Sequence, residues 1–208
     1  MRKIVAVLHV MPPETTTWTD VPGVLRVAVH TPYPDAPAEQ PDDVRAIAML
    51  WTDDASDPRT VVENAFGTAA PVAYLVDERV QWDYERDWQD GTPSPGVKRM
   101  SFVRRVAAID HGEFARHWGE EHAPLARVHH PGIWRYVQNV VVEPLTDDTP
   151  GLDGVAELHF RTYDDLQHRM YDSDEGKEII RADVRRFLDA RAGWRMLAVE
   201  RIVVAPPR

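Results

Sequence analysis

The sequence predicts an α+β protein in which two β-α-β-β-α-β modules follow each other in one chain. One observation is the order of strand-like and helix-like segments after residue 96, and the other is a weak internal repeat. This order of elements is that of the ferredoxin-like split β-α-β motif. We therefore expect residues 1–95 to form a degenerate copy of the module and residues 96–208 to form the complete one.

The first half is rich in strand-like segments. One helix is expected at residues 57–66, where Asp57-Pro58 resembles an N-cap followed by proline and Gly67 closes the helix. The segment from Pro12 to Pro22 stands where the first helix of the module would lie, so we expect this half to have lost that helix. Strands are expected where runs of Val, Ile and Ala are bounded by Pro, Gly and Asp, at residues 3–10, 24–33, 44–52 and 71–84.

The second half has a cleaner pattern. Residues 87–96 (DWQDGTPSPG) hold two prolines and two glycines, which makes them the best boundary between the halves. A helix begins with the capping box Asp110-x-x-Glu113, and a second begins near Asp164, breaks at residues 173–176 and resumes. The strands of this half are expected at residues 97–105, 134–142, 154–161 and 193–204.

The internal repeat pairs the last two strands of each half. Residues 73–80 (AYLVDERV) align with 196–203 (MLAVERIV), and residues 47–51 (IAMLW) align with 155–159 (VAELH). Both matches occupy the same positions in their halves, which favours two copies of one module over a chance likeness of apolar strands.

Composition limits the partners of the protein. The chain has 24 Lys and Arg against 34 Asp and Glu, a formal charge of −10, so it repels nucleic acid. The absence of cysteine excludes disulfides, thiolate nucleophiles and Cys-ligated metal centres. No apolar run reaches the roughly 18 residues of a membrane span, and the first residues indicate a strand rather than a signal peptide. We expect a cytoplasmic protein with no nucleic-acid or membrane partner.

A spaced series of residues in the second half carries a family resemblance. The series is Phe114, His117-Trp118, Glu121-His122-Ala123-Pro124, Pro131 and Arg135-Tyr136-Val137-Gln138-Asn139, followed by residues 153–158 and 182–189. Over about residues 98–204 it resembles the EthD-domain family of the dimeric α/β-barrel superfamily. The first 95 residues carry no such motif.

The resemblance implies a barrel made of two sheets packed face to face, with a pocket between each sheet and its own helices. Members of the family usually obtain the second sheet from another chain. Here the first half is expected to supply it, which makes the protein a monomeric pseudo-dimer or a homodimer with one lapsed pocket. The family's activities include lyase, dehydratase, decarboxylase and cyclase steps on aromatic or polyketide-like compounds, and auxiliary roles in degradation.

His122 is the first candidate for proton transfer. It follows Phe114 and Trp118 at helical spacing, so it faces the sheet, and Pro124 is expected to end or kink the helix beyond it. An imidazole with an ordinary pKa of about 6.5 gives and takes protons near neutrality, whereas the alternative is a buried histidine bonded to a backbone carbonyl. His117 lies about 140° around a regular helix from His122, so we expect it at the surface or rim and unable to share a metal ion.

Two strands carry further candidates. Glu157 and His159 alternate onto one face of their strand, where burial is costly unless they bond each other or a ligand, and a structural charge cluster is the alternative. Tyr136 and Gln138 alternate together and can orient a carbonyl or phenol, or simply pack with their polar ends at the rim. Asp183 lies among Arg181, Arg185 and Arg186, which predicts a structural ion pair.

The predicted function is that of a cofactor-independent acid/base enzyme, of lyase, dehydratase, decarboxylase or cyclase type, acting on a small hydrophobic aromatic or polyketide-like compound. His122 and Glu157 would be catalytic, and the substrate would contact Trp118, Tyr136, Gln138 and His159. A cofactor-free monooxygenase in the same pocket and a non-catalytic small-molecule binding or auxiliary protein are the alternatives. No cofactor and no metal are expected, because the histidines and carboxylates are not spaced in the sequence as metal ligands are. For the same reason the sequence gives no support to a haem or metal bound through His122.

Overall fold

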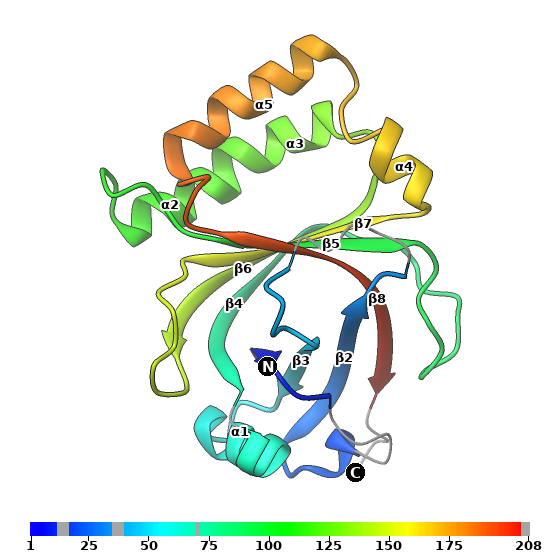
Figure 1. The fold of residues 1–208 in the computed structure, drawn as a ribbon, viewed down its shortest axis with the longest axis vertical. Helices are drawn as coiled ribbons and strands as arrows, with labels where there is room; N and C mark the ends of the chain where they lie inside the picture. Colours follow the sequence, from blue (N-terminus) through cyan, green and yellow to red (C-terminus); the bar gives the residue numbers. More distant parts are fainter. Residues whose placement is uncertain (12–16, 35–39, 70, 205–208) are drawn as a thin grey trace.

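The structure is a computed structural model that describes residues 1–11, 17–34, 40–69 and 71–204. Eight antiparallel strands form one closed barrel in the order β1-β3-β2-β8-β5-β7-β6-β4, and β4 pairs with β1 to close it (Figure 1). The strands are β1 Arg2–Leu8, β2 Val24–Pro32, β3 Ala46–Thr52, β4 Val72–Trp82, β5 Val97–Val103, β6 Ile133–Pro144, β7 Gly154–Phe160 and β8 Trp194–Val204. The α-helices are α1 Pro58–Phe66, α2 His111–His117, α3 Ala123–His129, α4 Tyr163–His168 and α5 Asp174–Phe187.

The strands of each half occupy one continuous side of the barrel. Strands β1–β4 stand in the order β4-β1-β3-β2, and β5–β8 stand in the equivalent order β8-β5-β7-β6. The halves meet where β2 pairs with β8 and where β4 pairs with β6. The α+β class is confirmed, and every predicted strand is present with bounds that differ by no more than two residues.

The segment predicted to replace the first helix is described only in part. Residues 12–16 lie outside the described residues, and Trp18–Asp20 form a short 3-10 turn whose Trp18 packs edge-on against Phe66 of α1. The predicted N-cap of α1 is present, because the Asp57 carboxylate accepts the Thr60 amide at 2.8 Å.

Three apolar layers hold the molecule together, one inside the barrel and one on each outer side. Helices α2, α3, α4 and α5 cover the outer face of β5–β8, whereas α1 lies against the outer face of β1–β4 (Figure 1). Successive residues of a strand point to opposite faces, so Phe102 belongs to the barrel interior while Ser101 and Val103 line the space under the helices.

The boundary segment between the halves is packed rather than free. Ser94 donates to the Glu200 carboxylate at 2.9 Å, and the Pro95 carbonyl lies 2.8 Å from Nε2 of His159. Residues 87–96 are therefore bonded to strands of the second half. Of the described helices, none has the length and apolar character needed to cross a membrane.

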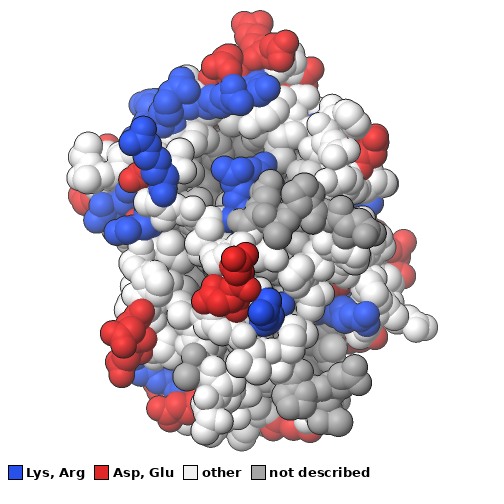
Figure 2. All heavy atoms as spheres, in the orientation of Figure 1, with Lys and Arg blue, Asp and Glu red and all other residues white. Residues whose placement is uncertain are grey.

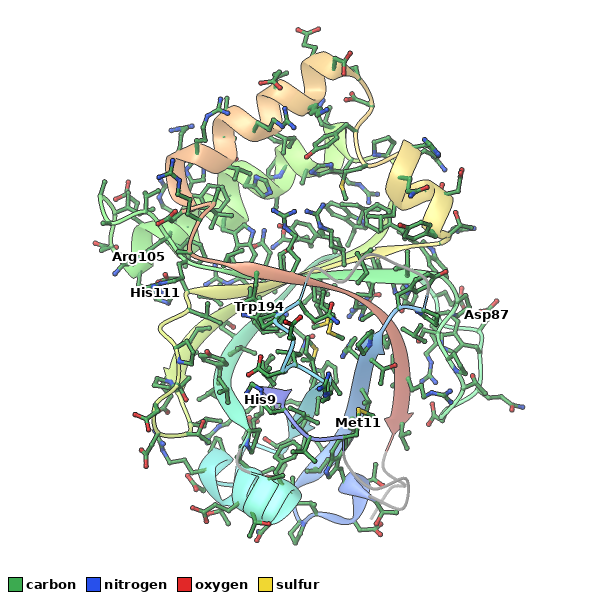
Figure 3. The ribbon with its side chains drawn as sticks, viewed as in Figure 1. His9, Met11, Asp87, Arg105, His111 and Trp194 are labelled. Atoms are coloured by element: carbon green, nitrogen blue, oxygen red, sulfur yellow. The ribbon has the colours of Figure 1, made fainter. Side chains whose placement is uncertain are left out.

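The first helix of the second half is longer and less regular than predicted. Its capping box is present, with Asp110 accepting the Glu113 amide at 2.8 Å. Asp153 accepts from the Arg105 amide at 2.8 Å and contacts Nδ1 of His111 at 3.0 Å, which fixes the start of α2. Figure 3 labels Arg105 and His111. Pro124 does not end the helix, because a π-helical turn, Trp118–His122, leads directly into α3.

A candidate active site between the sheet and its helices

A cavity of about 710 Å³ lies between the outer face of β5–β8 and the helices α3 and α5. Figure 2 shows a hollow in the upper half of the molecule with Lys and Arg atoms beside it. The sheet side of the cavity comes from outward-facing residues of four strands, and its helix side carries His122 and His130. The residues that line it include Arg99, Ser101, Trp118, His122, His130, Tyr136, Ala156, Leu158, Arg181, Arg185 and Arg195. This is the position that the family resemblance implies for the pocket.

The π-helical turn brings together two histidines that a regular helix would separate. In the π-helix the Ala123 amide bonds the Trp118 carbonyl five residues back, so five residues make about one turn. His117 and His122 therefore project toward the same side, and both are buried. The prediction that His117 lies at the surface or rim, some 140° from His122, is wrong because it assumed 3.6 residues per turn throughout.

Both histidines bond one carboxylate on the opposite helix. Nε2 of His117 lies 2.8 Å from Oδ1 of Asp183, and Nδ1 of His122 lies 2.8 Å from Oδ2. Burial alone would raise the pKa of Asp183, but the bonds from His122 and His117 outweigh it and lower that pKa. The predicted ion pair with Arg181, Arg185 and Arg186 is corrected to this histidine pair, with only Arg186 nearby at 3.8 Å.

This carboxylate fixes the proton positions of His122. An ionised Asp183 only accepts hydrogen bonds, so neutral His122 carries its proton on Nδ1 and keeps a lone pair on Nε2. No contact to Nε2 of His122 occurs within the described parts of the chain, and the residue lines the cavity. His122 thus presents a basic nitrogen to the space, held in place by Asp183 and by the Phe187 ring at 5.2 Å.

Tyr136 supplies a hydrogen-bond donor to the same cavity. Its hydroxyl oxygen accepts from Nε1 of Trp118 at 2.8 Å and from the Gln138 amide at 3.0 Å. Burial raises the pKa of Tyr136, which keeps the phenol neutral. With its oxygen already accepting twice, and with no acceptor for its own proton among the described residues, the hydroxyl is left to donate to a ligand.

Gln138 bonds residues that line the cavity and is not itself one of the lining residues. Its amide nitrogen donates to the Trp118 carbonyl at 2.8 Å, and its oxygen accepts from Gln81 at 3.0 Å. The Trp118 ring packs against β7 at Gly154, which leaves room for it: a Cβ there would stand 2.4 Å from Trp118 Cζ3. Gln138 and Trp118 therefore hold the Tyr136 hydroxyl in position.

His130 also lines the cavity. Burial lowers its pKa to about 4, and its ring bonds the Met170 carbonyl, so it is neutral at physiological pH.

Glu157 and His159 lie on the other face of the sheet. Their strand turns Ala156 and Leu158 toward the cavity, so Glu157 and His159 point into the barrel, as the alternation predicted. The structure thus brings Trp118, His122 and Tyr136 around one cavity and keeps Glu157 and His159 apart from it.

Inside the barrel these two residues belong to a buried charge network. Glu157 accepts from Lys3 at 2.7 Å, from Lys98 at 2.9 Å and from Asn139 at 3.0 Å. Burial alone would raise the pKa of Glu157, but Lys3 and Lys98 hold it well below its ordinary value. Glu78 and Glu200 provide the other negative charges, and Arg135 provides the third cation.

The network contains the one cluster of described residues with the spacing of a metal site. Ligand atoms of His30, Glu157 and Glu200 lie within 4.8 Å of one another. The ammonium of Lys98 contacts all three, at 3.4 Å from His30, 2.9 Å from Glu157 and in a direct bond to Glu200. A lysine cation therefore satisfies these carboxylates, which makes the cluster a poor fit for a metal ion.

A closed antiparallel barrel with a helix-covered side pocket defines the class of fold. Residues 107–191 match the family model of the EthD domain, which confirms the resemblance for this part of the second half. A solved structure described as "Crystal structure study of anthrone oxidase-like protein" has a TM-score of 0.68 at 12% identity and covers 99% of this chain and 94% of that chain.

Another solved structure, described as "putative monooxygenase from Lactobacillus acidophilus NCFM", has a TM-score of 0.52 at 10% identity over 98% of this chain and 96% of that chain. At such low identities the structural similarity establishes the fold alone, and it does so for both halves of the chain. No curated protein sequence matches the chain.

Proposed function

We propose that this protein is an acid/base enzyme that removes a proton from carbon on a small aromatic or polyketide-like compound. The observation that carries the proposal is the Asp183–His122 pair at 2.8 Å, with Nε2 of His122 available to a ligand in the cavity. The EthD domain and solved neighbours named for small-molecule chemistry support an enzyme.

The reaction begins at a carbon whose C–H bond is made acidic by a carbonyl group conjugated with it. Nε2 of His122 takes the proton, so the C–H bond breaks and its electron pair moves onto the carbonyl oxygen. The Asp183 carboxylate stabilises the imidazolium that forms. The Tyr136 hydroxyl donates to the oxygen that becomes negative, which lowers the barrier further. Return of the proton to another atom, or loss of a leaving group, completes a lyase- or cyclase-type step.

A second candidate shares the first step. The names of both solved neighbours favour oxygen chemistry. The second candidate is therefore a monooxygenase, proposed here without a cofactor, in which the carbanion gives electrons to O₂. The substrate CH₂ group then becomes C=O, one oxygen atom enters the product and the other leaves as water. The residue roles in proton removal are the same in both candidates.

Glu157 and His159 have no role in this proposal as substrate-contacting groups, because they face the barrel interior. We also propose that residues 1–95 and 96–208 are two copies of one module with one pocket retained. The equal strand order of the halves supports this, as does the apolar layer that fills the space between α1 and β1–β4.

Deuterium exchange on an activated methylene tests the proposal. The full chain is incubated in D₂O without oxygen with anthrone, an aryl ketone whose methylene is acidic, and incorporation is followed by mass spectrometry. We expect exchange above the buffer rate, and a fall of about 10² to 10⁴ in His122→Gln, the usual contribution of a positioned base. Gln keeps a donor for Asp183, so the thermal midpoint should stay near that of the natural chain.

His168→Gln is the matched control, since its side chain is 68% exposed on α4, and it should exchange at the natural rate. Equal exchange per folded molecule in His122→Gln would contradict the proposal, and absence of exchange together with tight ligand binding would point to a binding protein. The same assay in air separates the candidates, because oxygen uptake with formation of the ketone identifies the monooxygenase.

A further inference from the structure

The cavity is lined by more positive than negative side chains. Four arginines line it, Arg99, Arg181, Arg185 and Arg195, against the carboxylates of Glu178 and Asp189. That is an excess of two positive charges on one cavity of a chain whose net charge is −10. Because the field of the remaining surface repels anions, a cationic cavity marks the place to which an anion is drawn.

Two of these arginines have no anionic partner of their own. Arg181 pairs with Glu178 at 2.9 Å, and Asp189 accepts the backbone amide of Arg191 at 3.0 Å. Arg185 and Arg195 form no ion pair with any residue that the structure describes. Both are exposed on the cavity side of their elements, so their charge is directed to a ligand rather than to the protein.

The sheet aims Arg195 and Arg99 at the same space. Trp194, labelled in Figure 3, stacks on Phe102 in the barrel at 3.8 Å, so the next residue, Arg195, points to the helix side. Arg195 pairs across strands with Ser101, and Arg99 is two residues before Ser101 on β5. These guanidinium groups and Arg185 of α5 therefore border the part of the cavity formed by β5, β8 and α5.

We propose that the substrate of this site carries a carboxylate, bound by Arg185 and Arg195 with Arg99 beside them, while its aromatic part reaches Trp118, Tyr136 and His122. Guanidinium groups bind carboxylates through paired hydrogen bonds, and a fixed carboxylate would orient the reacting carbon toward His122. This inference rests on the proposed function, since it names the substrate class of the same pocket.

Binding of a matched pair of probes tests the inference without requiring turnover. Affinities of 2-naphthoate and the neutral 2-naphthamide are measured by calorimetry with the full chain at low salt. We expect the carboxylate to bind at least about tenfold more tightly. In the double variant Arg185→Gln, Arg195→Gln that preference should fall to about onefold, while the amide binds unchanged.

Arg45→Gln is the control, because Arg45 is an exposed arginine just before β3, and it should keep the full preference. His122→Gln should also keep it, so a failure of the acid/base mechanism and a failure of the carboxylate site give different results. Equal affinities of the two probes for the natural chain, failure of both to bind, or a preference that survives the double variant would each overturn the inference.

Discussion

The two faces of strand β7 have opposite chemistry. Glu157 and His159 point into a barrel interior where the ammonium groups of Lys3 and Lys98 are paired with the carboxylates of Glu78, Glu157 and Glu200. Ala156 and Leu158 point into a cavity whose histidine, tyrosine and arginines keep bonding capacity for a ligand. Buried polar groups that satisfy one another stabilise a fold, whereas groups left with a free atom facing a cavity are available for chemistry.

The strongest test of this comparison is Glu157→Gln. It leaves Lys3 and Lys98 buried with one carboxylate fewer, so we expect unfolding free energy to fall by about 3 to 5 kcal/mol in urea titrations. Turnover per folded molecule should not change. Glu143→Gln is the control, since its ion pair with Arg59 is about half exposed and is worth less than about 1 kcal/mol. Lost turnover with unchanged stability would instead support the catalytic role predicted from the sequence.

Asp183→Asn tests the other face. An amide nitrogen donates where the carboxylate accepted, so Nε2 of His122 no longer has a guaranteed lone pair. We expect proton exchange to slow by about 10²-fold, equivalent to about 2.7 kcal/mol in activation free energy. Asp172→Asn removes a comparable contact, to His129 at 3.1 Å, outside the cavity and should leave the rate unchanged. A rate loss of equal size in both variants would contradict the assignment.

The pH dependence of stability tests the barrel side of this comparison. Burial lowers the pKa of His159 to about 4, against an ordinary value of 6.5. Between these values the unfolded chain binds a proton that the folded chain does not, so stability is lost as pH falls from 6.5 to about 4. His159→Gln should recover roughly 2 kcal/mol of that loss at pH 4.5 in urea titrations. The control is His168→Gln, at an exposed position, which should leave the loss as it is in the natural chain. If unfolding free energy falls with pH as steeply in His159→Gln as in the natural chain, the assignment is contradicted.

The smallest expected effect concerns the contact between the strand and the helix. Gly154→Ala places a methyl group 2.4 Å from the Trp118 ring, which should cost about 1 kcal/mol in thermal unfolding and weaken the bond from Trp118 to Tyr136. Gly119→Ala, in the π-helical turn next to Trp118, is the control. The added methyl group meets its neighbours only at 3.7 Å and beyond, so the thermal midpoint of this variant should not fall. Equal midpoints for the two variants would show that the ring moves aside freely.

The strands were predictable because alternation and turn residues are local signals, and the two faces of residues 154–160 followed from a period of two. The cavity position was predictable from the family resemblance. The partner of His122 was not: Asp183 lies 61 residues away in sequence, and the nearby arginines gave the more obvious explanation.

The error about His117 has a separate cause. A π-helical turn changes the angle between residues five apart, and the sequence of the helix gives no periodic signal of it. Pro124, which cannot donate a backbone hydrogen bond, is the one local sign of irregularity, and it predicts an end or a kink of the helix without indicating a π-helical turn.

The position of β8 in the barrel has a consequence for how the chain folds. It stands between β2 and β5, so it pairs with residues about 170 positions earlier, and it follows the other seven strands along the chain. During synthesis the junction between β2 and β8 cannot form until residues 194–204 leave the ribosome, and until then Lys98 and His30 lack their contacts to Glu200. Barrel closure is therefore a late, long-range step, with the slow kinetics that high contact order imposes.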